Sequence, residues 1–517
     1  MAELKGAPAN CRPLDERARP WGLKWRSSVW FITAVVGLGV ASDLLVYSLI
    51  VPIIPFQLED LGYTGVSGLV GWLLFAYSAG IVIFTPPIAH LSEKYNNRQV
   101  PLLTGLVSLI GAEIMFMLAP AYWLMVVARL LQGLSSTVVW VAGLALLCDT
   151  VPESSVGRQL GIAMSGLSIG FLVGPPVSGA LYDRFGFHAP FIFGIIATAI
   201  DLVGRLLIIE RKHAILWGID PAAPRKADSE AVETEPKKRP EQDAISAAPE
   251  KNTEKTAREL TEPAETQSPV AVNGTQSEQA DTAGNPSDYA TPGPKVHLSL
   301  LAVMGKLMKS VRADAVFACT LLYAWILGSQ EPALPLHLQG VWNFNPSKVG
   351  LVYIAAVVPT LFSSTITGYF VDKLGTGPIT VVSLAFSLPW ILVLIVQSSL
   401  PLFIVVFALA NFGVSGTVSP LTAELASVTR QLDGVGYAHV YGAFNIAYGI
   451  GSAVGPIIGG QLYDHLTRGW MAICLFGAGS ALVAMILAIT SFGEVSFLAR
   501  IRKRMNRHTR AAHTTEA

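Results

Sequence analysis

Charged residues and cysteines are both scarce in this sequence, and their scarcity excludes several classes of protein. Asp, Glu, Lys and Arg make up only 14% of the 517 residues, whereas about 25% is usual in a soluble domain. Acidic and basic residues balance at 36 each, so no excess of positive charge indicates binding to nucleic acid. The 4 scattered cysteines suggest neither a disulfide framework nor a metal site. Because no Ser/His/Asp arrangement, histidine cluster or phosphate-binding glycine loop is found, we expect no enzyme, no metal and no cofactor.

Long apolar runs are what the sequence has instead, and hydrophobic residues make up 52% of it. A helix needs about 20 apolar residues to cross a bilayer. Twelve runs have about this length: 30–53, 67–88, 101–119, 122–148, 158–181, 190–209, 315–336, 348–371, 378–398, 401–427, 436–461 and 469–491. We therefore predict an all-α membrane protein with twelve transmembrane helices, embedded in the lipid bilayer.

Three hydrophilic stretches hold most of the charged residues and divide the chain. The longest is rich in Pro, Glu, Lys, Ser and Thr and poor in large apolar residues, so we predict a largely disordered linker. The predicted parts are an N-terminal tail at 1–29, a six-helix bundle at 30–209, the linker at 210–313, a second six-helix bundle at 314–492 and a basic tail at 493–517.

Lysine and arginine residues in the loops predict the orientation of the helices. Five of them lie in alternate loops on one side: Lys94, Arg98, Arg158, Lys373 and Arg430. Both tails and the linker lie on that side too and carry many more, so we predict that it is cytoplasmic. The first 28 residues contain no apolar segment typical of a cleavable signal peptide. We expect insertion into the plasma membrane or, alternatively, a vacuolar or vesicular membrane.

The two halves of the chain repeat each other in sequence. GFLVGPPVSGALYD at 170–183 matches GSAVGPIIGGQLYD at 451–464 in 8 of 14 positions, at an offset of 281. Pro52-Ile-Ile-Pro55 recurs as Pro332-Ala-Leu-Pro335, at an offset of 280. Two pseudo-symmetric six-helix bundles joined by a cytoplasmic linker are the layout of the major facilitator fold.

A glycine-rich motif lies in the fifth span and again in the eleventh. Its members are Gly170, Gly174, Pro175 and Gly179, repeated as Gly451, Gly455, Pro456 and Gly460. Glycine at every fourth position lets a neighbouring helix approach closely. The order GxxxGPPxxG also resembles the antiporter signature of major facilitators, so the motif favours either helix packing alone or packing together with antiport.

Arg129, Gln132 and Gly133 form an RLLQG sequence in the fourth span. An arginine at this depth has to face the interior of the bundle, because exposure to lipid is costly. The sequence resembles the RxxQG motif of major facilitators, in which the arginine tunes a nearby carboxylate for proton relay. Structural bracing is the alternative.

A degenerate gate motif follows the second span, with a partial copy after the eighth. The residues are Glu93, Lys94 and Arg98 in the first copy, and Asp372 and Lys373 in the second. They resemble the GxLxDRxGRR loop of major facilitators, whose charges form interhelical ion pairs at the cytoplasmic face and hold one conformation. The alternative is that they are solvated loop charges.

Five carboxylic acids lie inside the apolar runs: Asp43, Glu113, Asp201, Glu331 and Glu424. An unpaired charge in a membrane costs a few kcal/mol or more, so such residues indicate function. A carboxyl group removed from water favours its neutral form, whereas a nearby cation favours the charged form. One carboxyl group can therefore hold a proton or a cation in turn, which is a physical basis for exchange. Glu113 is the weakest candidate, because Met115 and Phe116 beside it are typical of a lipid-facing segment.

Local sequences in five spans resemble the vesicular monoamine transporter branch of the drug:proton antiporters, and the linker resembles that of fungal exporters. They are SDLL at 42–45 with VPIIP at 51–55, ARLLQG at 128–133, GPP at 174–176, HAPF at 188–191 and EPALP at 331–335. The resemblance implies that Asp43 and Glu331 serve amine recognition and proton coupling, and that Asp201 matches a further aspartate. Ser78 and Asn445 stand where that branch carries an ion pair of lysine and aspartate.

The acidic residues depart from the repeat. At an offset of 280, Val51 matches Glu331 and Asp43 matches Tyr323, so the scaffold repeats but these two acids do not. Other residues that could line a cavity are Tyr47, Trp140, Tyr353 and Tyr441.

Taken together, these patterns predict a proton-coupled antiporter that exports a small organic compound such as a drug or secondary metabolite. Asp43, Asp201, Glu331 and Glu424 are the candidate substrate and proton ligands. Its partners would be the substrate and protons, and it would work as a monomer driven by the proton gradient. The alternatives are a vesicular or vacuolar amine–proton exchanger and a non-transporting receptor on the same fold.

Overall fold

Helices provide all the regular secondary structure in the part of the chain that the structure describes. The computed structural model describes residues 20–94, 98–152, 155–221, 305, 307–429 and 437–493. Most of the predicted linker, residues 1–19 of the predicted N-terminal tail and almost all of the predicted C-terminal tail lie outside these residues. The helices of the two halves belong to one compact unit.

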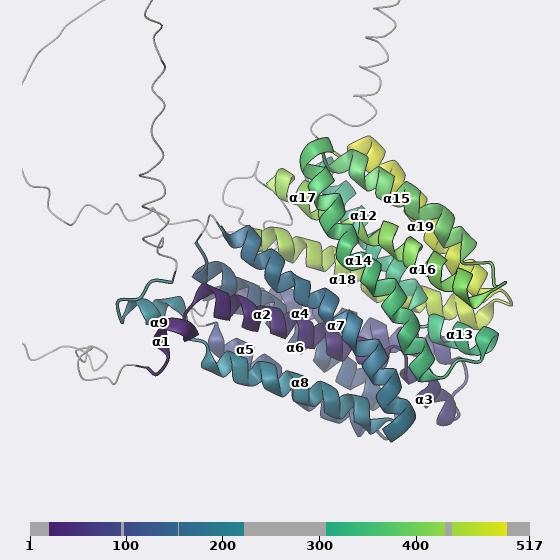
Figure 1. Ribbon diagram of the computed structural model, residues 1–517, viewed down its shortest axis with the longest axis horizontal. Coiled ribbons are helices and arrows are strands. Elements are labelled where there is room, and N and C mark those ends of the chain that lie inside the picture. The colour runs from purple at the N-terminus through teal and green to yellow at the C-terminus, as the bar shows by residue number, and fades with distance from the viewer. Residues whose placement is uncertain are drawn as a thin grey trace, which may run out of the picture. The chain divides into compact units, whose positions relative to one another are not determined.

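Each predicted apolar run of the N-terminal half coincides with a helix (Figure 1). The elements are α1 (Leu23–Arg26), α2 (Val29–Ile50), α3 (Ile54–Asp60), α4 (Val66–Lys94), α5 (Gln99–Met117), α6 (Tyr122–Thr150), α7 (Val156–Phe185), α8 (His188–Leu207) and α9 (Arg211–Ile215). The first run coincides with α2 and is followed directly by the short helix α3, and each of the other five runs coincides with a single helix.

The C-terminal half repeats this order, with a second helix pair in its fourth run. The elements are α12 (Val311–Gln330), α13 (Leu334–Trp342), α14 (Pro346–Leu374), α15 (Thr376–Val393), α16 (Leu400–Ser415), α17 (Val418–Thr429), α18 (Tyr437–His465) and α19 (Gly469–Ser491). Among the described residues, eleven helical segments are long and apolar enough to cross a bilayer. The glycine-rich α18 has 29 residues but is not one of the eleven.

The first helix of each half ends at the same point, one residue before a proline. Val51 is the C-cap of α2, and Glu331 is the C-cap of α12. Pro52 and Pro332 follow and have no N–H to donate, so the helical hydrogen-bond pattern stops there although Val51 and Glu331 keep helical backbone angles. Val51 and Glu331 therefore occupy equivalent backbone positions, as the repeat predicts.

The repeated glycines pack helices together within each half. A β-carbon on Gly170 of α7 would lie 2.5 Å from the carbonyl oxygen of Ala41 on α2. A β-carbon on Gly455 of α18 would lie 2.9 Å from the carbonyl oxygen of Trp325 on α12. Gly174 and Gly451 make similarly close contacts, with Ser48 and Leu321 respectively. Because only glycine permits such close approach, these contacts account for the packing role predicted for the motif.

The rest of the repeated motif joins the two halves to each other. Four contacts form this seam: Gly179 with Pro346, Pro175 with Gly350, Gly460 with Ser67 and Pro456 with Gly71. The first two contacts place α7 against α14, and the last two place α18 against α4. Each pair therefore repeats the other under the twofold pseudo-symmetry.

Two aspartates at the ends of the repeated LYD sequences extend this seam. Asp183 Oδ2 accepts hydrogen bonds from the side-chain amide of Asn345 (2.8 Å) and the backbone N–H of Ser347 (3.2 Å), at the start of α14. Asp464 Oδ2 accepts a hydrogen bond from the backbone N–H of Gly68 (2.6 Å), in the first turn of α4. A carboxylate is stabilised at a helix N-terminus by the helix dipole and the free N–H groups. Each half thus supplies an acidic cap to a helix of the other half.

The halves approach each other closely at the end that carries α3 and α13. There the side-chain amide of Gln339 on α13 donates a 2.9 Å hydrogen bond to Glu59 on α3. In Figure 1 the opposite ends, which carry α9 and α17, lie far apart. We refer below to these two ends of the helical unit as the α3/α13 end and the α9/α17 end.

Candidate functional site

A pair of contacting tyrosines connects Asp43 with Glu331. The hydroxyl of Tyr77 on α4 lies 3.3 Å from Asp43 Oδ2 on α2, and the hydroxyl of Tyr47 on α2 donates to Glu331 Oε2 at 2.6 Å. The centroids of the two tyrosine rings are 4.8 Å apart. Although they come from different halves, the two acids therefore belong to one continuous group, which we call the central cluster.

Asp43 receives all of its hydrogen bonds on one carboxylate oxygen. Ser136 and Trp140 on α6 donate to Oδ2 at 2.7 Å and 2.8 Å, and the Tyr77 hydroxyl lies between Oδ2 and the Ser136 hydroxyl, 3.0 Å from the latter. The other oxygen, Oδ1, is buried and has no hydrogen-bond partner among the described residues. Buried polar atoms are normally paired, so Oδ1 is the atom available to hold a proton or to meet a cation.

Arg129 on α6 lies fully buried against the tyrosine pair. Its guanidinium carbon is 5.4 Å from the ring centroid of Tyr47 and 5.3 Å from that of Tyr77. These distances are typical of cation–π contacts. Nη1 donates to Gln132 Oε1 at 3.1 Å, while Nε and Nη2 have no hydrogen-bond partner in the described chain. Arg129 therefore supplies a positive charge to the central cluster that no described carboxylate neutralises by direct contact.

The remaining residue of the RLLQG sequence has a packing role. Gly133 on α6 faces α4, where a β-carbon on it would lie 3.0 Å from the α-carbon of Gly80. This close approach brings α4, which carries Tyr77, against α6, which carries Arg129 and Ser136. The motif thus combines a charge with the contact that positions its aromatic neighbour.

The C-terminal half adds two more tyrosines around Glu331. Tyr353 on α14 and Tyr448 on α18 are both close enough to interact electrostatically with its carboxyl group. The Tyr353 hydroxyl is buried and has no hydrogen-bond partner among the described residues. Of the four residues suggested to line a cavity, Tyr47, Trp140 and Tyr353 belong to this region, whereas the side chain of Tyr441 lies outside the described residues.

Asp201 forms a buried ion pair within the N-terminal half. Its Oδ1 lies 3.3 Å from Nε of Arg205, one turn further along α8, and both side chains are almost fully buried. Gly39 on α2 leaves the space that the pair occupies, since a β-carbon there would lie 2.9 Å from Asp201 Oδ2 and closer still to the guanidinium. Asp201 lies within electrostatic range of Asp43, but its hydrogen-bond partner among the described residues is Arg205 and not a member of the central cluster.

Glu424 does not join the central cluster. Its carboxylate pairs with Arg312 at 2.7 Å, accepts the backbone N–H of Gly493 at 2.8 Å and contacts the Thr376 hydroxyl. Arg312 lies 19 residues before Glu331 on one continuous backbone path, about 28 Å at a rise of about 1.5 Å per residue. These contacts tie α12, α15 and α17 together through Glu424, and its role as an alternative proton site stays a prediction.

The gate residues are only partly described. Arg98, at the start of α5, forms a 3.0 Å ion pair with Asp149 near the end of α6, so one interhelical pair of the predicted kind exists within the N-terminal half. Lys373 contacts the ring and hydroxyl of Tyr369, one turn earlier on α14. The side chains of Glu93, Lys94 and Asp372 lie outside the described residues.

Ser78, a position singled out by the resemblance to amine transporters, is buried on α4. Its hydroxyl lies 3.1 Å from that of Ser452 on α18. The contact between the halves at this position is therefore neutral.

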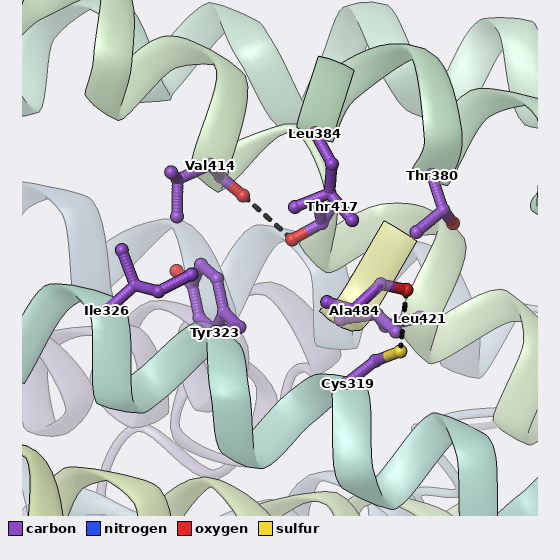
Figure 2. Close-up of a pocket in the computed structure, with 9 residues that line it drawn as sticks. All are labelled: Cys319, Tyr323, Ile326, Thr380, Leu384, Val414, Thr417, Leu421 and Ala484. Atoms are coloured by element: carbon purple, nitrogen blue, oxygen red, sulfur yellow. Dashed lines mark hydrogen bonds between the residues drawn. The ribbon is translucent and has the colours of Figure 1, made fainter. Parts of the chain in front are cut away.

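Two hollows in the C-terminal half lie away from the central cluster. Figure 2 shows the first, a cavity of about 10 Å³ inside the bundle, where Thr417 donates to the carbonyl of Val414 (2.7 Å) and the Cys319 thiol points to that of Ala484 (3.5 Å). This volume holds about one water molecule, so it has no room for an organic substrate. The second, of about 570 Å³, is an open hollow at the α3/α13 end beside Trp470.

Sequence reasoning missed Tyr77 and Ser136 and undervalued Glu113. Gln132, Ser136 and Trp140 recur at every fourth position of α6, which places them on one helix face, and this spacing was a usable signal. Glu113 is 1% exposed rather than lipid-facing, because α5 turns that face toward α8.

Comparisons with known proteins agree with this architecture. A family model described as the Major Facilitator Superfamily matches residues 29–266 and 316–512. The MFS-type transporter ppzB of Metarhizium rileyi is 28% identical over 500 residues, which are 92% of this chain and 96% of that protein. The human synaptic vesicular amine transporter is 32% identical over only 139 residues, 27% of each chain. The resemblance to amine transporters therefore holds for part of the chain, not for all twelve spans.

A solved structure shows the same fold. The crystal structure of the human organic anion transporter MFSD10 superposes with a TM-score of 0.58 at 15% sequence identity. The match covers 89% of this chain and 99% of that one. The predicted fold class, an all-α membrane protein built from two six-helix bundles, is thus confirmed.

Proposed function

The chain belongs to the major facilitator superfamily and is a multi-pass transmembrane transporter rather than an enzyme, and from this premise we propose that it exchanges protons for a small organic compound. The observation that carries the proposal is the central cluster, in which Asp43 of one half and Glu331 of the other are joined through Tyr77 and Tyr47. Transporters of this kind bind substrate where their two halves meet and alternate by rocking one half against the other. A proton-binding group that bridges the halves can respond to that motion.

Competition for Asp43 is the proposed basis of exchange. Ser136 and Trp140 donate to Oδ2 and the Tyr77 hydroxyl lies 3.3 Å from it, while Oδ1 is free of hydrogen bonds within the described chain. In a site shielded from water, a carboxylate has to be protonated or paired with a cation. A substrate cation that reaches Oδ1 therefore displaces a proton, and a returning proton displaces the substrate.

Glu331 and Arg129 adjust this exchange. Tyr47 stands between them, because it donates to Glu331 and its ring faces the guanidinium. When Glu331 takes up a proton, it accepts this hydrogen bond less strongly, and the contact between the halves weakens. We assign Glu331 the role of linking protonation to the relative position of the halves, and Arg129 the role of stabilising the charged form of the cluster.

The substrate class follows from the lining groups. Tyr47, Tyr77, Trp140 and Tyr353 offer aromatic surfaces beside a carboxylate, which suits an organic cation with an apolar body. We propose export across the plasma membrane, with both termini and the α9/α17 end on the cytoplasmic side. The nearly full-length similarity to the transporter ppzB supports a transport role, and that name specifies no substrate.

Reconstitution tests the proposal directly. Liposomes containing the purified protein are given an acidic interior, and uptake of the organic cations ethidium, tetraphenylphosphonium and rhodamine is followed. We expect at least one of them to accumulate, and nigericin, which collapses the pH gradient, to stop its accumulation. Accumulation that persists unchanged after nigericin would reject proton coupling.

A vesicular or vacuolar amine–proton exchanger is a second candidate. The 139-residue similarity to the synaptic vesicular amine transporter favours it. The neutral residues Ser78 and Asn445 oppose it, because the resemblance implies an ion pair of lysine and aspartate at these two positions. Fluorescent tagging distinguishes the two candidates by the membrane in which the protein resides.

A further inference from the structure

Glu113 is a buried acid that the central cluster does not use. It lies on α5, four residues before that helix ends at Met117, and its side chain is 1% exposed. Because α5 ends near the α3/α13 end of the N-terminal half, Glu113 lies between that end and the middle of the bundle. Gly194 on α8 makes space for it, since a β-carbon there would lie 3.3 Å from Glu113 Oε1.

The surroundings of Glu113 favour its protonated form. The hydroxyl of Thr198 lies 3.5 Å from Oε1, but it is closer to the carbonyl oxygen of Gly194, at 3.0 Å. A hydroxyl has one hydrogen to donate, and the nearer acceptor takes it. Oε2 has no hydrogen-bond partner among the described residues, and no described cation forms an ion pair with this carboxyl group. A carboxylate so poorly solvated would cost several kcal/mol.

Glu113 is also linked electrostatically to the exchange site. Among the described ionisable groups on α2, α6 and α8, the elements packed around it, Asp43 is the one within electrostatic range. Like charges at such positions disfavour each other, so the two acids cannot easily be ionised together. Neutralising Asp43 therefore makes it easier for Glu113 to release its proton.

We propose that Glu113 is a second proton-binding site, which exchanges its proton through the α3/α13 end and is coupled to the occupancy of Asp43. While Asp43 carries a negative charge, that charge favours retention of the proton on Glu113. Arrival of a proton or a cation at Asp43 removes the opposing charge, the O–H bond on Glu113 breaks, and the proton passes to water. This inference rests on the proposed proton exchange and adds a relay outside the path of the substrate.

Infrared spectroscopy of the reconstituted protein tests the first part without any substrate. A protonated carboxyl group gives a C=O stretching band that a carboxylate lacks. We expect a band of this kind that disappears in Glu113→Gln, is restored in Glu113→Asp and is weakened in Asp43→Asn, because loss of the opposing charge favours release of the proton from Glu113. If Glu113→Gln leaves every such band in place, Glu113 is not protonated and the proposal is wrong.

Uptake driven by the pH gradient tests the second part. We expect Glu113→Gln to lower ethidium uptake at least fivefold, while exchange of internal for external ethidium at equal pH stays unchanged and Glu113→Asp recovers most of the uptake. If the band is lost but the pH response is intact, Glu113 is only a structural group and the relay is overturned. If wild-type uptake itself ignores the pH gradient, the proposed function fails instead, and the infrared result still decides the protonation of Glu113.

Discussion

The hydroxyl of Tyr47 donates a 2.6 Å hydrogen bond to Glu331, so the first helix of one half is tied to the end of the first helix of the other. Val51, the counterpart of Glu331 in the N-terminal half, is a buried apolar residue that cannot form such a bond. The connection therefore exists once rather than twice. In the proposed exchange, this bond would link the protonation of Glu331 to the relative position of the halves.

Asp43→Asn should abolish proton-driven transport. Asparagine retains an acceptor for the bonds from Ser136 and Trp140 but cannot exchange a proton. We expect uptake driven by the pH gradient to fall by at least tenfold in liposomes, while the elution profile of the purified protein stays the same. Unchanged uptake would remove Asp43 from the exchange.

Tyr47→Phe should change the coupling without unfolding the protein. The phenyl ring keeps its contacts with the Tyr77 ring and with Arg129, but the hydrogen bond to Glu331 is lost. We expect the dependence of transport on pH to shift, and Glu331→Gln to produce a shift in the same direction. The double variant should show no further shift, and additive shifts would mean that the two residues act independently.

Gly39→Ala should destabilise the N-terminal half. The added methyl group would collide with Arg205 and Asp201, whose buried ion pair fills the space beside Gly39. Overpacking of this kind costs about 1–3 kcal/mol, measurable as a lower temperature of unfolding in detergent. Gly111→Ala is the matched control, because a β-carbon there meets nothing within 4 Å. Equal unfolding temperatures for the two variants would contradict the assigned packing.

Glu424→Gln should lower stability and leave the pH response of the remaining folded protein intact. Its carboxylate pairs with Arg312, which would be left with an uncompensated charge. Removing one partner of a buried pair costs about 3–5 kcal/mol, whereas this arginine is 20% exposed and the loss should lie below that range. Thermal unfolding and uptake per folded molecule measure the two effects. Loss of the pH response at normal stability would support Glu424 as a proton site.

Asp183→Ala combined with Asp464→Ala should open the α3/α13 end. Each aspartate caps a helix of the opposite half, and a cap of this kind contributes about 1 kcal/mol. Loss of both should shift the equilibrium between closed and open forms about tenfold or more, since about 1.4 kcal/mol corresponds to a factor of ten. Spin labels on α3 and α13 would report the change as a longer distance between the labels. An unchanged distribution of distances would show that the two aspartate caps do not hold the halves together at this end.

The parts of this structure that follow from local chemistry were predictable from the sequence. Proline fixes the helix break at Val51 and at Glu331, and glycine spacing identifies the packed face of α7. The acids stand out because a charge in an apolar run is rare. Their partners did not stand out, since Arg312 and Glu424 are 112 residues apart and meet only in the folded bundle. The burial of Glu113 likewise depends on how α5 is rotated against α8, which neighbouring residues such as Met115 do not determine.

The paired aspartate caps have a consequence for the ancestry of the chain. In the seam between the halves, Asp183 reaches from α7 to α14, and Asp464 reaches from α18 back to α4. In this reciprocal arrangement each half supplies both a capping aspartate and a helix N-terminus that is capped. The same reciprocity is found in an isologous dimer. A single ancestral half could have satisfied both caps by pairing with a second copy of itself. Gene fusion would then have preserved this homodimer interface inside one polypeptide, leaving Asp43 and Glu331 free to diverge.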